Sequence, residues 1–338
     1  MTEVARPPRL KDVAALAGVD PSTASRVLNG HRRGIRVETA RRVLSASERL
    51  GYRPNASARG LRTARTSCIG LVLPDFANPV YASVINGVER RAAERDATVL
   101  VHGVDATRSD DYNRLTREAR VDGLLFGAFS RGSHVLDELN ATRRPYVLIN
   151  RTAPEAPASV ILDDAAAAAL AVRHLAELGH RRIAYVGGPA DLDTAERRRG
   201  GFESTLAELG LPLTRTHVVD GADPGQARAA TARLFAGEDV PTAVVAWTTM
   251  ATLGVVAELH SRGRRIPEDV SVVSLQDTWL DEHAWPSLTA VSMPLEEMGA
   301  RAVDLLLALV EGGAPETVVV TSPSPTLVRR ASTAQPPS

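Results

Sequence analysis

The sequence predicts an α/β protein in which a small helical N-terminal unit precedes two lobes, each a doubly wound parallel sheet. Three observations support this prediction. Short stretches with helical spacing of apolar residues fill residues 10–50. Beyond Cys68, apolar runs typical of buried strands alternate with amphipathic helical patterns, and the series occurs twice. A chain of 338 residues, 44% of them hydrophobic, can bury more than one core.

Three helices are expected in the N-terminal unit. The first spans 10–17 and ends at Gly18, because glycine adopts the left-handed conformation that closes a helix at little cost. The second begins at Pro21, where the missing N–H is not needed, and Asp20 is its N-cap. A third helix, in VETARRVLSASERLGY, closes the core. Its core-facing residues are Ala40, Val43, Leu44, Ser47 and Leu50.

The second helix has a polar side that its own folding does not require. Ala24, Val27 and Leu28 form its apolar stripe. Two helices joined by a tight turn, with a third in support, form a helix-turn-helix whose second helix enters the DNA major groove. The alternative for a single helix is an ordinary solvated face. The residues on the polar side are Ser22, Thr23, Ser25, Arg26 and Asn29.

The charge of the chain is divided unequally. Residues 1–65 contain 14 Arg or Lys and 5 Asp or Glu, a net charge of +9. The rest of the chain contains 26 Arg or Lys and 35 Asp or Glu, a net charge of −9. Such a basic end would attract a polyanion, with an affinity that falls as salt rises. A solvated basic arm is the alternative, but the turn and the third helix favour DNA binding.

Within the second helix, the residue types suggest separate contacts. Ser22 and Arg26 lie one turn apart and can reach base edges, and an arginine fork matches guanine O6 and N7. Thr23, Ser25 and Asn29 are better suited to phosphate oxygens, which fix register without reading sequence.

The motifs LKDVAALAGVDPSTASRVLNG, ETARRV, LGYRPN and ARGLRT resemble the headpiece of the LacI/GalR family of bacterial transcription regulators. The resemblance extends over almost the whole chain. It implies base contacts from Pro21, Ser22 and Arg26 and backbone contacts from Tyr52 and Asn55. Arg36 departs from the family, which usually has a helix-capping serine there, and we expect it to contact a phosphate instead. The candidate DNA-binding residues are Asp20, Pro21, Ser22, Thr23, Ser25, Arg26, Asn29, Arg36, Tyr52, Asn55, Ala58 and Leu61.

A basic segment, residues 54–66, follows the headpiece, which we assign to residues 1–53. It resembles the family's hinge helix, which inserts a leucine wedge, here Leu61, into the minor groove after a small residue, here Ala58. A helix this short is marginal in water, and Gly60 weakens it by about 1 kcal/mol. It is therefore expected to fold against DNA or a partner hinge, and the alternative is a flexible basic linker.

The core, residues 67–330, is expected to hold two series of parallel strands. The first comprises CIGLVL, ATVLVH, VDGLLFG and PYVLIN, and the second RRIAYVGG, THVVD, TAVVAW and VSVVSL. Helices are expected around 80–95, 110–119, 133–140, 165–178, 194–209, 226–236 and 250–262, with a last one in LTAVSMPLEEMGARAVDLLLALVEG that returns to the first lobe.

The resemblance implies a periplasmic-binding-protein-like arrangement of this core. The chain would cross between lobes near Leu162, Ala290 and Ser322, giving an N-lobe of about 67–162 and 291–322 and a C-lobe of about 163–290 and 323–330. Residues 331–338 are expected to be disordered. The sequence ends without a leucine heptad, so a homodimer is favoured over a tetramer.

Ligands of such lobes bind at the carboxyl ends of the strands. By the resemblance, Arg198 aligns with the arginine that grips effector oxygens. The family usually has Asn-Asp where Thr248 and Thr249 stand, and an aspartate where Gln276 stands, while Ala222 replaces an aromatic residue. The candidate effector-binding residues are Asp75, Tyr81, Arg198, Trp247, Thr248 and Gln276.

These departures suggest that the effector is not a neutral hexose read by paired carboxylates. A more anionic, smaller or less hydroxylated ligand is the hypothesis, with Trp247 as a stacking surface, and a sugar held by other groups is the alternative. The expected function is that of a DNA-binding regulator, a repressor, whose operator affinity a small molecule such as a sugar or related metabolite controls. No cofactor is expected.

Other features favour structural roles. The lone Cys68 is interpreted as a buried thiol, and His174 and His180 lack metal-binding spacing. Gly187 and Gly188 suit an ordinary strand-to-helix turn better than a phosphate loop. No nucleophile with a matching base is found, which argues against an enzyme. The start of the chain lacks a secretory signal and no span is apolar enough for a membrane, so a cytoplasmic location is expected instead of a transport role.

Overall fold

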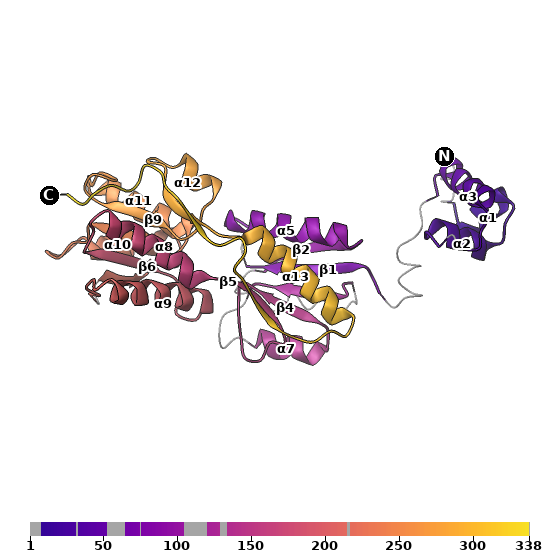
Figure 1. The fold of residues 1–338 in the computed structure, drawn as a ribbon, viewed down its shortest axis with the longest axis horizontal. Coiled ribbons are helices and arrows are strands. Elements are labelled where there is room, and N and C mark those ends of the chain that lie inside the picture. The colour runs from indigo at the N-terminus through magenta and orange to yellow at the C-terminus, as the bar shows by residue number, and fades with distance from the viewer. Residues whose placement is uncertain are drawn as a thin grey trace, which may run out of the picture. The chain divides into compact units, whose positions relative to one another are not determined.

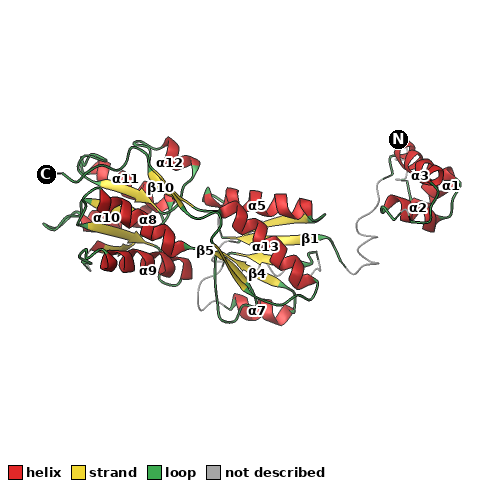
Figure 2. Ribbon diagram, in the orientation of Figure 1, coloured by secondary structure: helices red, strands yellow, loops and turns green. Residues whose placement is uncertain are grey.

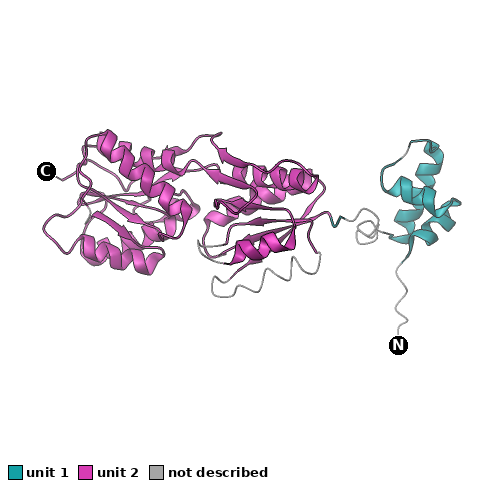
Figure 3. Ribbon diagram, turned by 90° about the horizontal axis from the view of Figure 1, so that it is seen from below, with its two compact units in different colours: residues 1–66 teal, residues 67–338 magenta. Residues whose placement is uncertain are grey.

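The computed structural model describes residues 8–31, 33–52, 65–74, 76–104, 120–128, 134–214 and 217–337. The chain divides into two compact units, residues 1–66 and residues 67–338 (Figure 3). The α/β fold class is confirmed, since the first unit is helical and the second contains two six-stranded sheets.

The first unit contains three helices: α1 (Leu10–Ala17), α2 (Pro21–Leu28) and α3 (Val37–Leu50). Gly18 ends α1 with a φ of 64°, in the left-handed region. The Asp20 carboxylate accepts the Ser22 N–H at 2.8 Å and so caps α2, with Pro21 in the first turn. Both predicted helix boundaries are therefore confirmed.

The core of this unit is made of small side chains from all three helices. Ala24 and Val27 of the predicted stripe are buried, whereas Leu28 is half-buried. Ala46, which was not predicted, is also buried. The buried apolar set is Val13, Ala14, Ala17, Ala24, Val27, Ala40, Val43 and Ala46.

The first sheet of the second unit is entirely parallel and has the strand order β11-β5-β4-β3-β1-β2. Helices flank it (Figure 2), and α13 lies beside α5 on one face (Figure 1). The strands are β1 (Cys68–Leu73), β2 (Thr98–Gly103), β3 (Gly123–Phe126), β4 (Tyr146–Ile149), β5 (Ser159–Leu162) and β11 (Thr317–Val320), and the helices are α5 (Val80–Glu94), α7 (Val135–Thr142) and α13 (Leu295–Val310).

The second sheet has the order β12-β10-β9-β8-β6-β7 and is parallel except for its edge strand β12, which runs antiparallel to β10. α8 packs against α9, and α10 against α11. The strands are β6 (Ile183–Gly187), β7 (Val218–Asp220), β8 (Ala243–Ala246), β9 (Ser271–Ser274), β10 (Thr289–Ser292) and β12 (Thr326–Val328), and the helices are α8 (Asp164–Glu177), α9 (Asp193–Glu208), α10 (Pro224–Leu234), α11 (Thr249–Ser261) and α12 (Trp279–His283).

All eight strands named from the sequence are present, as are the expected helices that fall within the described residues. The helix expected at 110–119 lies outside them. The sequence prediction missed four strands, β5, β10, β11 and β12, and the short helix α12. β10 lies within the segment that was expected to hold the last helix, and β11 and β12 are partly exposed edge strands.

The chain passes between the sheets after β5, after β10 and after β11. The first and third passages fall near Leu162 and Ser322, as expected. The second lies later than expected, because β10 stays in the second sheet as far as Ser292. We call the two halves the N-lobe and the C-lobe.

The expectation of a disordered tail is wrong for residues 331–337. Ser332 is fully buried and its Oγ donates to the carbonyl of Val272 at 2.6 Å. Ala334 accepts at its carbonyl from Ser271 Oγ at 3.2 Å and lies 2.9 Å from His180 Nε2. The composition of this segment does not reveal that its small polar residues bind to strands β9 and β10.

Candidate functional site

The exposed side of α2 contains residues that the sequence predicts to contact DNA. Ser22 and Arg26 are exposed, and the described residues offer no hydrogen-bond or ion-pair partner to the Arg26 guanidinium. Asn29 is half-buried and donates from Nδ2 to the Ser25 carbonyl at 2.7 Å. Arg26 is therefore free to meet a base edge. Ser22 is exposed beside it but also bonds to Asp20, and Asn29 closes the end of its own helix.

Asp20 has a structural role at the start of α2. Hydrogen bonds from Ser22 hold the pKa of this carboxyl below its ordinary value, and the charge of Arg26 acts in the same direction. An ionised carboxylate near phosphates is repelled by them, so Asp20 acts by fixing the position of Ser22.

The remaining headpiece candidates are less alike. Arg36 is exposed at the N-cap of α3, and its side chain makes no capping bond within the described chain. Tyr52 packs against the helical core and its carbonyl accepts from Ser47 Oγ at 3.0 Å. Asn55, Ala58 and Leu61 lie outside the described residues.

A cleft between the two lobes of the second unit gathers most of the effector candidates. It opens where β1, β4, β8 and β9 end, as the parallel topology requires. Tyr81, Arg198, Trp247, Thr248 and Gln276 all line it, whereas Asp75 is outside the described residues. The other lining residues are Leu73, Asn78, Val80, Val84, Ile149, Asn150, Arg151, Thr194, Leu295 and Met298.

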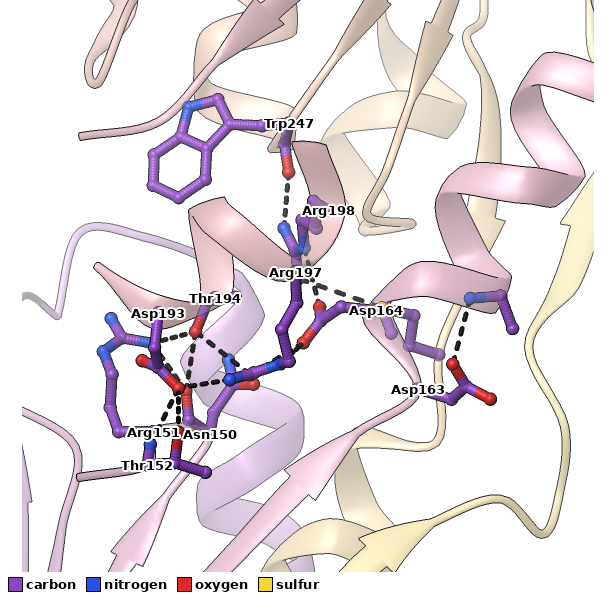
Figure 4. Close-up of polar contacts among 12 residues, drawn as sticks. Asn150, Arg151, Thr152, Asp163, Asp164, Asp193, Thr194, Arg197, Arg198 and Trp247 are labelled. Atoms are coloured by element: carbon purple, nitrogen blue, oxygen red, sulfur yellow. Dashed lines mark hydrogen bonds and ion pairs between the residues drawn. The ribbon is translucent and has the colours of Figure 1, made fainter. Parts of the chain in front are cut away.

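Arg198 is engaged inside the protein. It is 1% exposed, its Nε donates to Asp164 Oδ1 at 2.8 Å, and its Nη1 donates to the Trp247 carbonyl (Figure 4). The third nitrogen, Nη2, faces Met293 Sδ at 3.9 Å, a weak acceptor. Two of its five N–H groups are thus donated to strong acceptors within the protein, which leaves fewer for the ligand oxygens that the resemblance assigns to it.

Asp164 is shared with a second arginine. Arg197 donates to Asp164 Oδ2 from Nη2 at 2.8 Å and also pairs with Asp193. Asp193 in turn accepts from both the N–H of Thr152, at 2.7 Å, and its hydroxyl, at 2.9 Å. Because Thr152 follows β4 of the N-lobe and Asp193 begins α9 of the C-lobe, these bonds join the lobes.

A second connection between the lobes lies beside the first. Arg151 donates from Nη1 to Thr194 Oγ1 at 2.7 Å and to the Asn150 carbonyl at 2.8 Å. Thr194 Oγ1 donates to the same carbonyl at 2.7 Å. We call Asn150, Arg151, Thr152, Asp193 and Thr194 the interlobe latch (Figure 4).

Trp247 is held rigidly at the cleft. Its indole Nε1 donates to the Gly221 carbonyl at 3.1 Å. Gly188 lies so close to the indole that a Cβ there would be 2.5 Å from Cε3, so only glycine fits. Gly188 therefore serves the packing of Trp247, consistent with its interpretation as a structural turn.

The two threonines that replace the family's Asn-Asp have different roles. Thr248 caps α11, its Oγ1 accepting from the Ala251 N–H at 3.2 Å, and it lines the cleft. Thr249 is buried and donates to Asp281 Oδ2 at 2.7 Å. Burial raises the pKa of Asp281, against the hydrogen bonds from Thr249 and Thr278.

Asn150, Arg151 and Thr194 were missed in the sequence. Their signal was their position: Asn150 and Arg151 directly follow a buried strand, where parallel sheets place binding groups. Thr194 lies in the first turn of α9, and nothing local connects it to Arg151.

The described ranges contain no helix long and apolar enough to cross a bilayer. The same residues hold no group of three or more His, Cys, Asp or Glu able to bind a metal ion.

Comparison with known proteins agrees with both units. Residues 9–55 match the family model "Bacterial regulatory proteins, lacI family", and residues 172–333 match "Periplasmic binding protein-like domain". Catabolite control protein A of Priestia megaterium is 32% identical over 92% of this chain and 95% of its own length. This chain belongs to the lacI family. The transcriptional regulator CelR of Thermobifida fusca is 35% identical over 93% of the chain and 95% of its own length.

Solved structures of the lacI family share the fold. A CelR–cellobiose complex has a TM-score of 0.73 at 32% identity, covering 96% of this chain and 99% of that one. A lac repressor dimer bound to operator and the anti-inducer ONPF has a TM-score of 0.82 at 26% identity, covering 97% and 100%. This lacI-family chain is thus a transcriptional regulator, and the recognition from its motifs is confirmed.

Proposed function

We propose that this lacI-family regulator is a repressor that binds a pseudo-palindromic operator as a homodimer and that a small molecule in the interlobe cleft controls the binding. The observation that carries the DNA part is α2, with Ser22 and Arg26 exposed on one side. The related lac repressor, bound to operator in its solved structure, supports this assignment.

The geometry of the cleft supports control by a ligand. Its cavity measures about 50 Å³, much smaller than the roughly 300–1,000 Å³ of typical ligand pockets. A sugar-sized molecule therefore requires the lobes to separate, and separation breaks the hydrogen bonds of the interlobe latch. Ligand binding is in this way coupled to lobe orientation, with a coupling free energy of the order of 1–3 kcal/mol expected for such systems.

An exposed aromatic surface on the C-lobe supports the homodimer. Trp279 is 64% exposed and Trp285 is 88% exposed, although tryptophan usually buries most of its surface. Large exposed aromatic residues mark interaction surfaces, and a second copy of the chain is the occupant that a pseudo-palindromic operator requires.

The decisive experiment is a gel shift with full-length protein and the intergenic DNA upstream of its own gene, at moderate ionic strength. We expect a specific complex that competitor DNA of random sequence does not displace, and a change in its affinity when the cleft ligand is added. If the protein shows no preference for any duplex over random DNA, the proposed function is wrong.

A further inference from the structure

We propose that the effector carries a single carboxylate, which pairs with Arg151 in the cleft. This assignment of a chemical class rests on the proposed function, because it concerns the ligand of the same cleft. The observation behind it is a buried cation without a counter-ion.

Arg151 is 8% exposed and lines the cleft. Its acceptors are neutral: the Asn150 carbonyl at 2.8 Å and the Thr194 hydroxyl at 2.7 Å, both bonded to Nη1. Its Nε is buried with no hydrogen-bond partner, and no carboxylate of the described residues comes within ion-pair distance of the guanidinium. Burying an unpaired charge is costly, so an anion in the cleft would relieve that cost.

The neighbouring arginines do not share this deficit. Arg197 and Arg198 both contact Asp164, and Arg197 also contacts Asp193. Two cations thus meet two carboxylates, and Arg151 leaves the connected group with a net charge of +1. Arg151 and Arg198 are the charged residues in the described lining. The cleft is therefore matched to a monoanion.

Two further acceptor atoms of the cleft lining indicate what else the ligand carries. Gln276 Oε1 and Asn150 Oδ1 are buried without a partner, and both residues line the cleft. A hydroxyl donates to either oxygen and a carboxylate cannot. Together with Arg151 they fit a hydroxylated acid. A phosphate monoester, which carries close to two charges at neutral pH, exceeds the single charge that the site leaves uncompensated.

The test is titration calorimetry on the full-length protein with matched pairs that differ in a carboxylate. The probes are glucuronate and glucose, galacturonate and galactose, and glycerate and glycerol, with glucose 6-phosphate and glycerol 3-phosphate as phosphate arms. We expect at least one acid to bind about tenfold or more tightly than its neutral partner and than the phosphate ester, because the charge-assisted pair with Arg151 is absent from the neutral compound.

Variants assign the effect to the residue. Arg151→Gln removes the charge and should abolish the preference for the acid. Arg199→Gln removes an exposed arginine of the C-lobe, paired with Glu203, and should preserve it. Thermal unfolding of each variant checks that it is folded, and Arg151→Lys, which retains the charge, should keep part of the preference if Arg151→Gln is unstable.

The proposal is overturned if a neutral compound binds as tightly as its acid, if a phosphate ester binds best, if none of the acids binds, or if Arg151→Gln retains the preference. None of these results affects the gel shift with operator DNA in the absence of ligand. Failure of the inference can therefore be told apart from failure of the proposed function.

Discussion

Arg198 and Asp164 form a fully buried ion pair, with Nε and Oδ1 2.8 Å apart and both side chains at most 1% exposed. Asp164 opens α8 immediately after the chain enters the C-lobe from β5, and Arg198 belongs to α9. The pair fixes the packing of two helices beside the cleft. This gives a structural role to an arginine that also lines the cleft.

Substitution of Arg198 is therefore expected to weaken the fold. Arg198→Gln leaves Asp164 buried with Arg197 as its remaining partner, and we expect the free energy of unfolding to fall by about 3 kcal/mol. Urea denaturation of the full-length protein measures this. Arg199→Gln should change the stability little. If the stability is unaltered and ligand binding is lost, Arg198 is a ligand contact and not a structural residue.

Two buried histidines that contact the C-terminal segment, His174 and His180, predict a dependence of stability on pH. Burial holds the pKa of His180 below its usual 6.5, and burial likewise lowers the pKa of His174. Below pH 6.5 the unfolded chain binds protons that the folded chain does not, so the free energy of unfolding should decrease as pH falls through that region. Denaturation from pH 7.5 to 5.5 measures this loss. In His180→Gln the dependence should be shallower, and an unchanged slope would contradict the assignment.

Arg26 is expected to read sequence. Arg26→Ala should weaken operator binding by about 1–3 kcal/mol while leaving binding to random DNA nearly unchanged, because a base contact contributes to specific binding only. Fluorescence anisotropy with both duplexes measures the difference. Arg41→Gln removes an exposed arginine of α3 that pairs with Glu38 and serves as the control. Equal losses on the two duplexes would assign Arg26 to the phosphates.

Arg36 is expected to contact a phosphate. Arg36→Ala should reduce the slope of log affinity against log salt by about 1, since one fewer counter-ion is released on binding. Operator titrations at four or five salt concentrations give the slope. If both the affinity and the slope stay at the values of the unmodified protein, Arg36 does not touch the DNA.

Trp285 is expected to stabilise the dimer. Trp285→Ser removes a large exposed aromatic side chain and should weaken self-association about tenfold or more. Sedimentation velocity over a concentration series measures the change, with Leu213→Ser as a control at another exposed apolar position. A dimer of unchanged affinity would mean that the two copies associate through a different surface.

The alternation of strands and helices was predictable because parallel strands buried on both faces are continuous apolar runs, such as those of β1 and β8. The headpiece was predictable for a different reason: the Asp20 cap and the Gly18 turn act within a few residues. Both features are local.

The partners within the cleft could not be predicted in this way. The resemblance assigned Arg198 to effector oxygens, but its partner Asp164 lies on another helix and nothing in α9 points to it. The same limit applies to Arg151, because its lack of a carboxylate partner becomes visible only when the lobes are packed together. Ion pairing in an interior depends on tertiary contacts, which the order of residues does not state.

The three tryptophans of this chain occupy two kinds of environment. Trp247 is 8% exposed at the cleft, whereas Trp279 and Trp285 face solvent. In the separated protomer, acrylamide should therefore quench the emission of two indoles and spare the third. The shielded emission gives the molecule an intrinsic optical reporter, in which a shift in wavelength on adding a metabolite signals occupancy of the cleft without any attached dye.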